Sequence, residues 1–311
     1  MNLKKKIRLF QEFGPLVGFA SACSSAIRFP MAVTRWKDRC IVRYLKENYG
    51  SALLKWQGVR TPPGVEGESE SAPIWSVWWQ GEENAPEIVK MCFASIRKHR
   101  RQHPFRVITR ENYQEYIELP EYIIEKSRSG VIRLTHLSDI VRVCLLSQYG
   151  GLWLDSTIFA AGTIPDEIFG SDYYSIKQGF DPKSHAVTQG RWASFCQAAR
   201  KGSPLCGVAL DIQLKYWEKQ SSLIDYILID YAFELAYEEL PECRRLLDSI
   251  PVNNRGVESL RPLLSSPWDA EVFKKLTADT QFFKLTWKHP FNKMRFGRET
   301  FYGHLTKSLL G

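Results

Sequence analysis

The chain has 311 residues, of which 44% are hydrophobic, and this is enough to bury a sizeable core in one large α/β domain with or without helical additions. Lysine and arginine exceed aspartate and glutamate by 42 − 34 = 8, which favours anionic partners such as nucleotide phosphates or an acidic membrane face. Seven cysteines, an odd number without a Cys-x-x-Cys pair, argue against a disulfide framework and a zinc site and suit a reducing cytosol.

Residues 1–57 differ in character from the rest of the chain. A lysine-rich start (residues 4–8) precedes a largely apolar stretch (residues 13–33). Proline and glycine interruptions and the charge of Arg28 make this stretch a poor spanning helix, since such a helix needs roughly 20 predominantly apolar residues. Two interpretations stay open: an amphipathic segment that lies on an anionic membrane surface, and a helical extension packed on the following domain.

Residues 58–72 are rich in glycine, proline, glutamate and serine, which indicates a linker. We expect the main domain to span residues 73–311. It opens with a β-rich strand at residues 74–80, then a helix that begins at Pro86, then a strand at residues 105–109. This strand–helix–strand order predicts parallel pairing and a nucleotide pocket at the carboxyl ends of the strands.

The junction at residues 134–158 is the most informative part of the sequence. Its apolar positions recur with helical spacing, at Leu137, Ile140, Val141, Cys144 and Leu145. Asp139 and Arg142 lie three residues apart on a different face and can act together. A double glycine then ends the helix, and Asp155 follows at the carboxyl end of a short strand, where an α/β sheet usually carries its polar groups.

The pattern Ser-Asp-x-x-Arg, then Gly-Gly-x-x-x-Asp-x-Thr, is filled by Ser138, Asp139, Arg142, Gly150, Gly151, Asp155 and Thr157. It resembles the core of the capsular polysaccharide synthesis proteins, a glycosyltransferase family related to yeast-type α-mannosyltransferases and to clostridial toxin domains. The resemblance implies that Asp139 and Arg142 lie beside a nucleotide-sugar donor. It also implies that the acidic motif binds Mn²⁺ or Mg²⁺. Thr157 stands where the commonest, Asp-x-Asp form has a second aspartate.

The chemistry of sugar transfer explains these residue types. Breaking a sugar–diphosphate bond develops negative charge on the leaving phosphate, and a hard cation held by oxygen ligands can neutralise it. Asp155 is a candidate ligand and catalytic residue, and Thr157 can add a hydroxyl or a water-mediated contact. If the strand continues through Thr157, Trp153 shares a side with both. Singly, each residue could be a turn cap or a surface pair, but the ordered set favours the functional interpretation.

Downstream of the motif, we expect strands at residues 158–161 and 173–177 and helical segments at residues 192–199, 214–219 and 223–233. The last segment places Asp225 and Asp230 in an apolar setting, where carboxylates are costly without partners. In retaining transferases that this chain resembles, an aspartate on the corresponding helix approaches the sugar. Asp225 and, second, Asp230 are therefore candidate catalytic residues, and pairing with a nearby Arg or Lys is the alternative.

The resemblance adds further candidates. The family's first strand approaches the donor, which makes Trp79 and Gln80 possible donor contacts, although a tryptophan cluster is more often part of a core. A C-terminal cation or imidazole can face the leaving diphosphate, so Lys284 is a candidate for diphosphate binding and His289 for metal binding. A lone histidine is more often simply hydrogen-bonded.

Several motifs are absent from the sequence. It has no G-x-x-x-x-G-K-[ST] and no G-x-G-x-x-G phosphate loop, which disfavours P-loop enzymes and nicotinamide dehydrogenases. It has no G-x-S-x-G and no His-Glu-x-x-His, which disfavours serine hydrolases and metalloproteases of those types. A diphosphate bridged by a metal ion needs none of these motifs.

Taken together, the sequence predicts an α/β protein with a GT-A-type nucleotide-sugar-binding sheet, flanking helices and a helical N-terminal extension. The expected activity is transfer of a hexose, from a UDP-sugar by preference, to a glycan or lipid-linked saccharide acceptor in capsule or surface-polysaccharide synthesis. Retention of the anomeric configuration is implied by the resemblance. We expect a cytoplasmic protein, attached peripherally to the inner face of the plasma membrane.

Two rival functions differ in class. One is a non-catalytic protein that binds glycan or lipid intermediates on a degenerate transferase fold, suggested by Thr157 and by the 13% aromatic content. The other is a nucleic-acid-binding protein, suggested only by the net charge. Because the basic residues are spread along the chain without a nucleic-acid motif, we expect no nucleic-acid partner.

Overall fold

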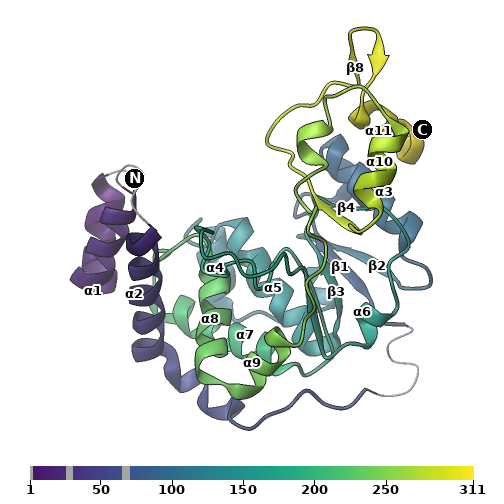
Figure 1. Cartoon of the computed structure of the whole chain (residues 1–311). Coiled ribbons are helices and arrows are strands. Elements are labelled where there is room, and N and C mark those ends of the chain that lie inside the picture. Colours follow the sequence, from purple (N-terminus) through teal and green to yellow (C-terminus); the bar gives the residue numbers. More distant parts are fainter. Residues whose placement is uncertain (1–2, 26–30, 65–70) are drawn as a thin grey trace.

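The structure, a computed structural model, describes residues 3–25, 31–64 and 71–311, and only the backbone of residues 3–6 and 25. Its centre is a five-stranded sheet built from β1 (Ile74–Val77), β2 (Phe105–Ile108), β3 (Gly151–Leu154), β5 (Tyr173–Ser175) and β6 (Cys196–Ala199). The strand order is β2-β1-β3-β6-β5 (Figure 1). β1 runs parallel to β2 and β3, whereas β6 runs antiparallel to β3 and β5.

Two short antiparallel pairs lie outside this sheet. The first joins β4 (Ile158–Ala160) to β7 (Phe282–Lys284), in a register that sets Ile158 opposite Lys284. The second is a hairpin of β8 (Met294–Arg295) and β9 (Arg298–Glu299). The first pair matters for the site, because it brings Lys284 beside the chain that leaves β3.

Helices cover both faces of the central sheet (Figure 1). One group comprises α4 (Glu121–Arg128), α5 (Leu134–Tyr149), α7 (Pro204–Lys219), α8 (Leu228–Glu239) and α9 (Pro241–Asp248). The other comprises α3 (Glu87–His99), α10 (Ala270–Thr277) and α11 (Phe301–Leu310), and a single turn, α6 (Glu167–Gly170), precedes β5. Short 3₁₀ turns lie at Gly50–Ala52, Leu54–Trp56, Glu82–Asn84, Tyr113–Glu115 and Arg261–Leu263.

Alternate residues of the central strands enter two separate hydrophobic cores. Trp75 and Trp153 belong to the core beneath α5 and α7. Ile74, Leu152 and Leu154 belong to the core beneath α3 and α11. This division follows from the two-residue period of a strand, and burial of both faces is typical of a sheet with parallel strands. Because both faces of the sheet are covered, side chains that contact a ligand are expected at the ends of the strands.

The double glycine after α5 is required by the turn into β3. Gly150 and Gly151 have φ angles of 71° and 97°, which residues with a side chain adopt at a cost. A Cβ atom on Gly151 would also lie 2.1 Å from the carbonyl oxygen of Pro73. This close approach fixes where β3 begins and hence where Asp155 stands after its end.

The N-terminal helices α1 (Leu3–Ser25) and α2 (Met31–Tyr49) pack against each other, and α2 packs on α7 and α8 (Figure 1). Leu9, Phe13 and Val17 of α1 are buried in the same core as α7 and α8. The hydroxyl of Tyr231 in α8 donates a hydrogen bond of 2.6 Å to Asp38 of α2. These contacts are those of a packed extension.

The same α1 helix keeps other apolar side chains in contact with solvent, namely Ile7, Phe10, Leu16 and Phe19. In the described ranges we found no helix with the length and apolar character that crossing a bilayer requires. α1 is kinked at Gly14–Pro15, so Ile7 and Phe10 lie before the kink and Leu16 and Phe19 after it, and the four do not form one continuous helical face. Of the predicted linker, residues 65–70 lie outside the described residues, as do residues 26–30 of the apolar stretch.

The predicted fold class, an α/β sheet with flanking helices and a helical N-terminal region, is confirmed. Two local predictions were wrong. The expected helix at residues 192–199 contains β6, whose four residues are all buried between β3 and β5, so sheet pairing decides its conformation. The expected helix at residues 223–233 begins only at Leu228, because the Asp225 side chain accepts a hydrogen bond from the Ile227 backbone N–H and so favours a turn.

Candidate active site

A cavity of about 960 Å³ opens at the carboxyl ends of β1 and β3. Most of its walls come from the end of β1, α5, the segment after β3 and residues 284–289 at and after the end of β7, and Phe195, Tyr226, Glu258 and Arg261 complete them. The residues that line it include Trp78, Trp79, Gln80, Ser138, Arg142, Asp155, Thr157, Phe195, Lys284, Trp287 and His289. Besides Asp155, the sequence indicated nine candidate site residues. Six of them line this cavity, namely Trp79, Gln80, Arg142, Thr157, Lys284 and His289.

Asp155 lies at the centre of this cavity's polar groups. Its Oδ1 atom accepts hydrogen bonds of 2.9 Å from Nη2 of Arg142 and of 2.9 Å from Nε1 of Trp153. Its Oδ2 atom accepts one of 2.7 Å from Nζ of Lys284. Burial alone would raise the pKa of Asp155, but the charges of Lys284 and Arg142 and these hydrogen bonds outweigh burial and lower it. Asp155 is therefore an anion at neutral pH.

Arg142 is fixed from three sides. Asp139, one turn earlier on α5, lies with Oδ1 3.2 Å from Nη2 of Arg142, and the guanidinium group lies 5.1 Å from the ring centroid of Trp153. Both Asp139 and Arg142 are buried. Arg142 lines the cavity, whereas Asp139 lies behind it, so Asp139 orients the guanidinium group. The buried Nε atom of Arg142 has no hydrogen-bond partner within the protein.

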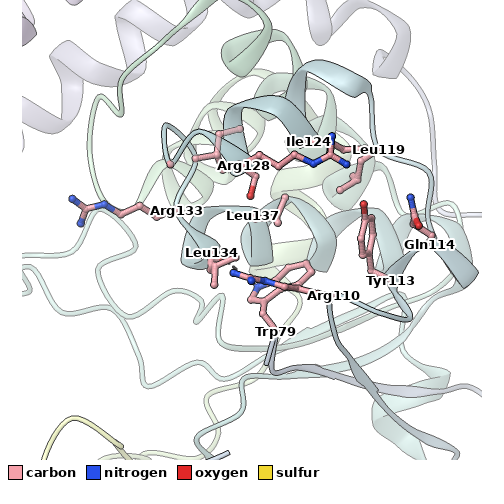
Figure 2. Close-up of a pocket in the computed structure, with 13 residues that line it drawn as sticks. Trp79, Arg110, Tyr113, Gln114, Leu119, Ile124, Arg128, Arg133, Leu134 and Leu137 are labelled. Carbon is pink, nitrogen blue, oxygen red and sulfur yellow. Dashed lines mark hydrogen bonds between the residues drawn. The ribbon is translucent and has the colours of Figure 1, made fainter. Parts of the chain in front are cut away.

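A second cavity, of about 690 Å³, adjoins the large one at Trp79. Nε1 of Trp79 donates a hydrogen bond of 2.8 Å to Oγ of Ser138, which holds the ring against α5. Figure 2 shows the second cavity, which lies between α4, α5 and the segment after β2. Trp79 and Leu134 line both cavities, and Gln80 lines only the large one.

Sequence reasoning missed Arg110 and Tyr113, which line this second cavity beside Trp79 (Figure 2). The ring centroids of Tyr113 and Trp79 are 6.1 Å apart. A signal was present: Arg110 and Tyr113 come directly after β2, at the same edge of the sheet as the end of β1. Parallel strands place such residues together.

The two aspartates proposed near α8 have different positions. Asp225 precedes α8 and pairs with Lys37 of α2 at 2.9 Å, and it does not line the cavities described here. Asp230, on α8, is 7% exposed and lines a third cavity of about 370 Å³. Its Oδ1 accepts a hydrogen bond of 3.0 Å from Nε1 of Trp192. Burial, with a contribution from the charge of Asp139, raises the pKa of Asp230 to about 7.

The residues around Asp155 can be tested for their fit to a divalent cation. In the described part of the chain, no group of three or more His, Cys, Asp or Glu side chains is placed to hold a metal ion. Mg²⁺, however, is usually bound by one or two carboxylates together with substrate phosphates. Anionic Asp155 and the hydroxyl group of Thr157 line the cavity and offer oxygen ligands of this kind. The exposed His289 also lines it, but an imidazole nitrogen is not a ligand that Mg²⁺ prefers.

A family model described as "Capsular polysaccharide synthesis protein" matches residues 27–305. The chain belongs to this family. The match contains the whole of residues 134–158, so the resemblance inferred from that segment is confirmed. No curated protein matches the chain. Among solved structures, the chain is similar to "PaToxG Glycosyltransferase", with 13% identity and a TM-score of 0.39 over 70% of this chain and 83% of that one.

Proposed function

We propose that this family member is a glycosyltransferase with a GT-A-type site at Asp155. It would move a hexose from a nucleotide diphosphate sugar, with a UDP-sugar favoured, to a glycan or lipid-linked saccharide in capsule or surface-polysaccharide synthesis. Membership of the capsular polysaccharide synthesis family supports the pathway. The observation that carries the chemistry is the convergence of Lys284 and Arg142 on Asp155 in a large cavity at the strand ends.

The two adjoining cavities suit the two halves of such a donor. The cavity of about 690 Å³ offers aromatic rings at Trp79 and Tyr113 and the cation of Arg110, which suit a nucleoside. The cavity of about 960 Å³ offers Lys284 and Arg142, which suit a diphosphate. Since Trp79 lines both cavities, a single nucleotide sugar could occupy the two cavities at once.

Lys284 and Arg142 perform the electrostatic part of the reaction. The leaving diphosphate gains negative charge as the bond to the sugar breaks, and fixed cations stabilise that charge most in a site with little water. A bound Mn²⁺ or Mg²⁺, held by Asp155 and Thr157, would add Lewis-acid stabilisation of the same charge. Retention needs no side-chain nucleophile if the leaving phosphate assists attack from the front face.

Peripheral attachment to an anionic membrane is part of the proposal, with the protein on the cytoplasmic side. Phe10, Leu16 and Phe19 keep exposed apolar side chains on α1, and the sequence places a lysine-rich stretch (residues 4–8) at its start. Apolar burial combined with basic residues is the usual basis of interfacial binding. A lipid-linked acceptor would be reached from this position.

The rival, a non-catalytic saccharide-binding protein, has one observation in its favour. Both carboxylate oxygens of Asp155 already accept hydrogen bonds from basic side chains, and Thr157 adds no second charge. A degenerate site could keep this arrangement for stability alone. The two functions differ in turnover, which can be measured directly.

The test is release of nucleotide diphosphate from a panel of UDP-glucose, UDP-galactose, UDP-N-acetylglucosamine and GDP-mannose, with Mn²⁺, with Mg²⁺ and with chelator. We expect one donor to be turned over in the presence of a cation, and Asp155→Asn to lower its rate by about 100-fold or more. Asp166→Asn is the matched control, because Asp166 forms an exposed pair with Arg101 outside the cavity. Donor binding without turnover in wild-type protein would favour the rival.

A further inference from the structure

The hairpin of β8 and β9 presents large apolar side chains to solvent. Phe296, in its turn, is 88% exposed, and Met294, on β8, is 56% exposed. The hairpin projects beyond α11 at the C-terminal end of the molecule (Figure 1). Single exposed apolar residues are common on protein surfaces, but two of them together on a projecting turn indicate a contact surface.

The turn of this hairpin holds Phe296 in a costly backbone conformation. Phe296 and Gly297 have φ angles of 50° and 75°. A two-residue hairpin turn with positive φ at both positions favours Asn, Asp or Gly at the first, because a bulky side chain is strained there. The Phe296 ring is exposed and lies 5.2 Å from the guanidinium group of Arg295, so packing does not explain a phenylalanine at this position. Contact with a partner does.

The hairpin belongs to a basic segment. Residues 280–298 contain no Asp or Glu and five basic residues, namely Lys284, Lys288, Lys293, Arg295 and Arg298. Lys284 and Lys293 pair with the carboxylates of Asp155 and Glu87. The other three form no ion pair with any residue that the structure describes. Their charge is therefore available to an anionic partner.

The base of the hairpin is fixed to the rest of the chain. The backbone N–H of Thr300 donates a hydrogen bond of 2.9 Å to the carbonyl of Lys293. The Thr300 hydroxyl donates one of 2.6 Å to the carbonyl of Asn292. The N–H of Trp268 donates one of 2.8 Å to the carbonyl of Glu299. A fixed base presents the exposed turn in one position.

The same segment connects the hairpin to the proposed diphosphate site. Lys288 and His289 line the large cavity, and β8 begins at Met294, five residues after His289. Five residues of fully extended chain span at most about 18 Å. A surface that binds the hairpin would therefore lie close to the cavity.

We propose that the β8–β9 hairpin binds the surface of an anionic bilayer. Phe296 and Met294 enter the headgroup region. The guanidinium groups of Arg295 and Arg298 contact the lipid phosphates. Apolar insertion combined with basic residues is the usual basis of such binding. A nucleic acid would meet the same charges, but Met294 offers no ring on which a base can stack.

This inference deepens the proposed peripheral attachment and rests on it for the class of partner. It assigns the attachment to a part of the chain other than α1. Because the hairpin follows the cavity so closely in the chain, binding there would hold the proposed active site beside a lipid-linked acceptor.

The first test is sedimentation of the full-length protein, without nucleotide sugar, with vesicles of phosphatidylglycerol and phosphatidylcholine at low salt. Phe296→Asn should weaken binding by about fivefold or more. Because Asn suits the turn, thermal unfolding should show a stability equal to or above that of wild type. Phe180→Asn is the matched control and should leave binding unchanged, since Phe180 is 65% exposed but precedes an acidic residue, Asp181.

The second test concerns charge. Arg295→Gln together with Arg298→Gln should weaken binding to these vesicles by about tenfold or more, because each basic residue near an anionic surface contributes to attraction. Arg60→Gln together with Arg106→Gln is the matched control, since both are exposed, lie outside residues 280–298 and change the net charge equally. An equal effect of the two pairs would show that net charge alone governs binding and would overturn the proposal.

Comparison with Leu16→Asp plus Phe19→Asp in α1 separates the two attachments. Loss of binding in Phe296→Asn, with binding kept in the α1 variant, would support the hairpin and remove the role proposed for α1. The reverse result would overturn the hairpin and leave the proposed attachment intact. Weaker binding of single-stranded DNA by Phe296→Asn, with vesicle binding unchanged, would assign the hairpin to a nucleic acid and also overturn the proposal.

Discussion

Nζ of Lys284 lies 2.7 Å from Oδ2 of Asp155, although 129 positions separate the two residues in the sequence. The contact exists because β7, which ends at Lys284, pairs with β4, which begins three residues after Asp155. A C-terminal strand thus brings a cation to an aspartate whose other hydrogen-bond donors, Arg142 and Trp153, lie close to it in the sequence. The sequence motif contains Arg142, which contacts Oδ1 of Asp155, but not Lys284, the cation that contacts Oδ2.

Replacing Lys284 by Gln should lower stability in a pH-dependent way. The pKa of Asp155 is lowered in the folded protein, so the stability gained from its anion is present above the ordinary value of 3.8 and is lost as the pH falls through the folded-state pKa. Lys284→Gln should cost about 1–3 kcal/mol at pH 7 and less near pH 3. Urea unfolding at both pH values measures this, and an equal cost at both would contradict the ion-pair account.

Arg142→Lys should weaken the binding of the donor that the protein turns over. Lysine keeps the positive charge but lacks the flat guanidinium group, which lies over the Trp153 ring while its Nη2 contacts both Asp155 and Asp139. Asp139→Asn should have a smaller effect, because Asp139 positions Arg142 and does not line the cavity. Calorimetric titration with the nucleotide sugar measures both, and unchanged affinity in Arg142→Lys would return the residue to a structural role.

The raised pKa of Asp230 predicts that stability falls as the pH rises, which is opposite to the pH dependence expected from Asp155. The pKa of Asp230 is raised to about 7, so the native state holds a proton that the unfolded chain releases near pH 4. The stability that this proton provides is fully present below pH 4 and is lost as the pH rises to about 7, by at most about 4 kcal/mol. Asp230→Asn should therefore be more stable than wild type at pH 8 and similar at pH 4. A constant difference across this range would contradict the raised pKa.

Two of the glycines that have a positive φ, Gly151 and Gly130, provide a further comparison. Gly151→Ala should destabilise the protein by about 1–2 kcal/mol for its positive φ, with overpacking against Pro73 adding about 1–3 kcal/mol. Gly130→Ala is the control, since Gly130 also has a positive φ, of 77°, but faces open space. Thermal unfolding of both variants should show a clearly larger loss for Gly151→Ala.

Membrane binding through the exposed apolar side chains of α1 can be tested with two substitutions. Leu16→Asp together with Phe19→Asp should reduce sedimentation with vesicles of phosphatidylglycerol and phosphatidylcholine at low salt, because it removes apolar contact and adds negative charge. Phe180→Asp is the control, since Phe180 is also exposed but lies in the segment between β5 and β6. Wild-type protein that stays in the supernatant would rule out the membrane role.

Residues 134–158 could be interpreted from the sequence because local rules govern them: helical spacing, a glycine stop and a strand end. In the structure Arg142 contacts both Asp139 and Asp155. Asp225 could not be placed, because its partner Lys37 lies in α2, and no local pattern links the two. The strand at residues 196–199 was missed for a similar reason, since its two neighbours in the sheet, and not its own residues, determine its conformation.

The most direct test of the central claim is the rate of nucleotide diphosphate release by Lys284→Gln compared with wild type and with Lys293→Gln. Lys293 also forms an ion pair with a carboxylate, Glu87, at 2.6 Å, but it is exposed and lies outside the cavity. If Lys284 stabilises the leaving diphosphate, Lys284→Gln should lower the rate by about 100-fold or more and Lys293→Gln should leave it unchanged. Equal rates in all three proteins would contradict the assignment of the active site.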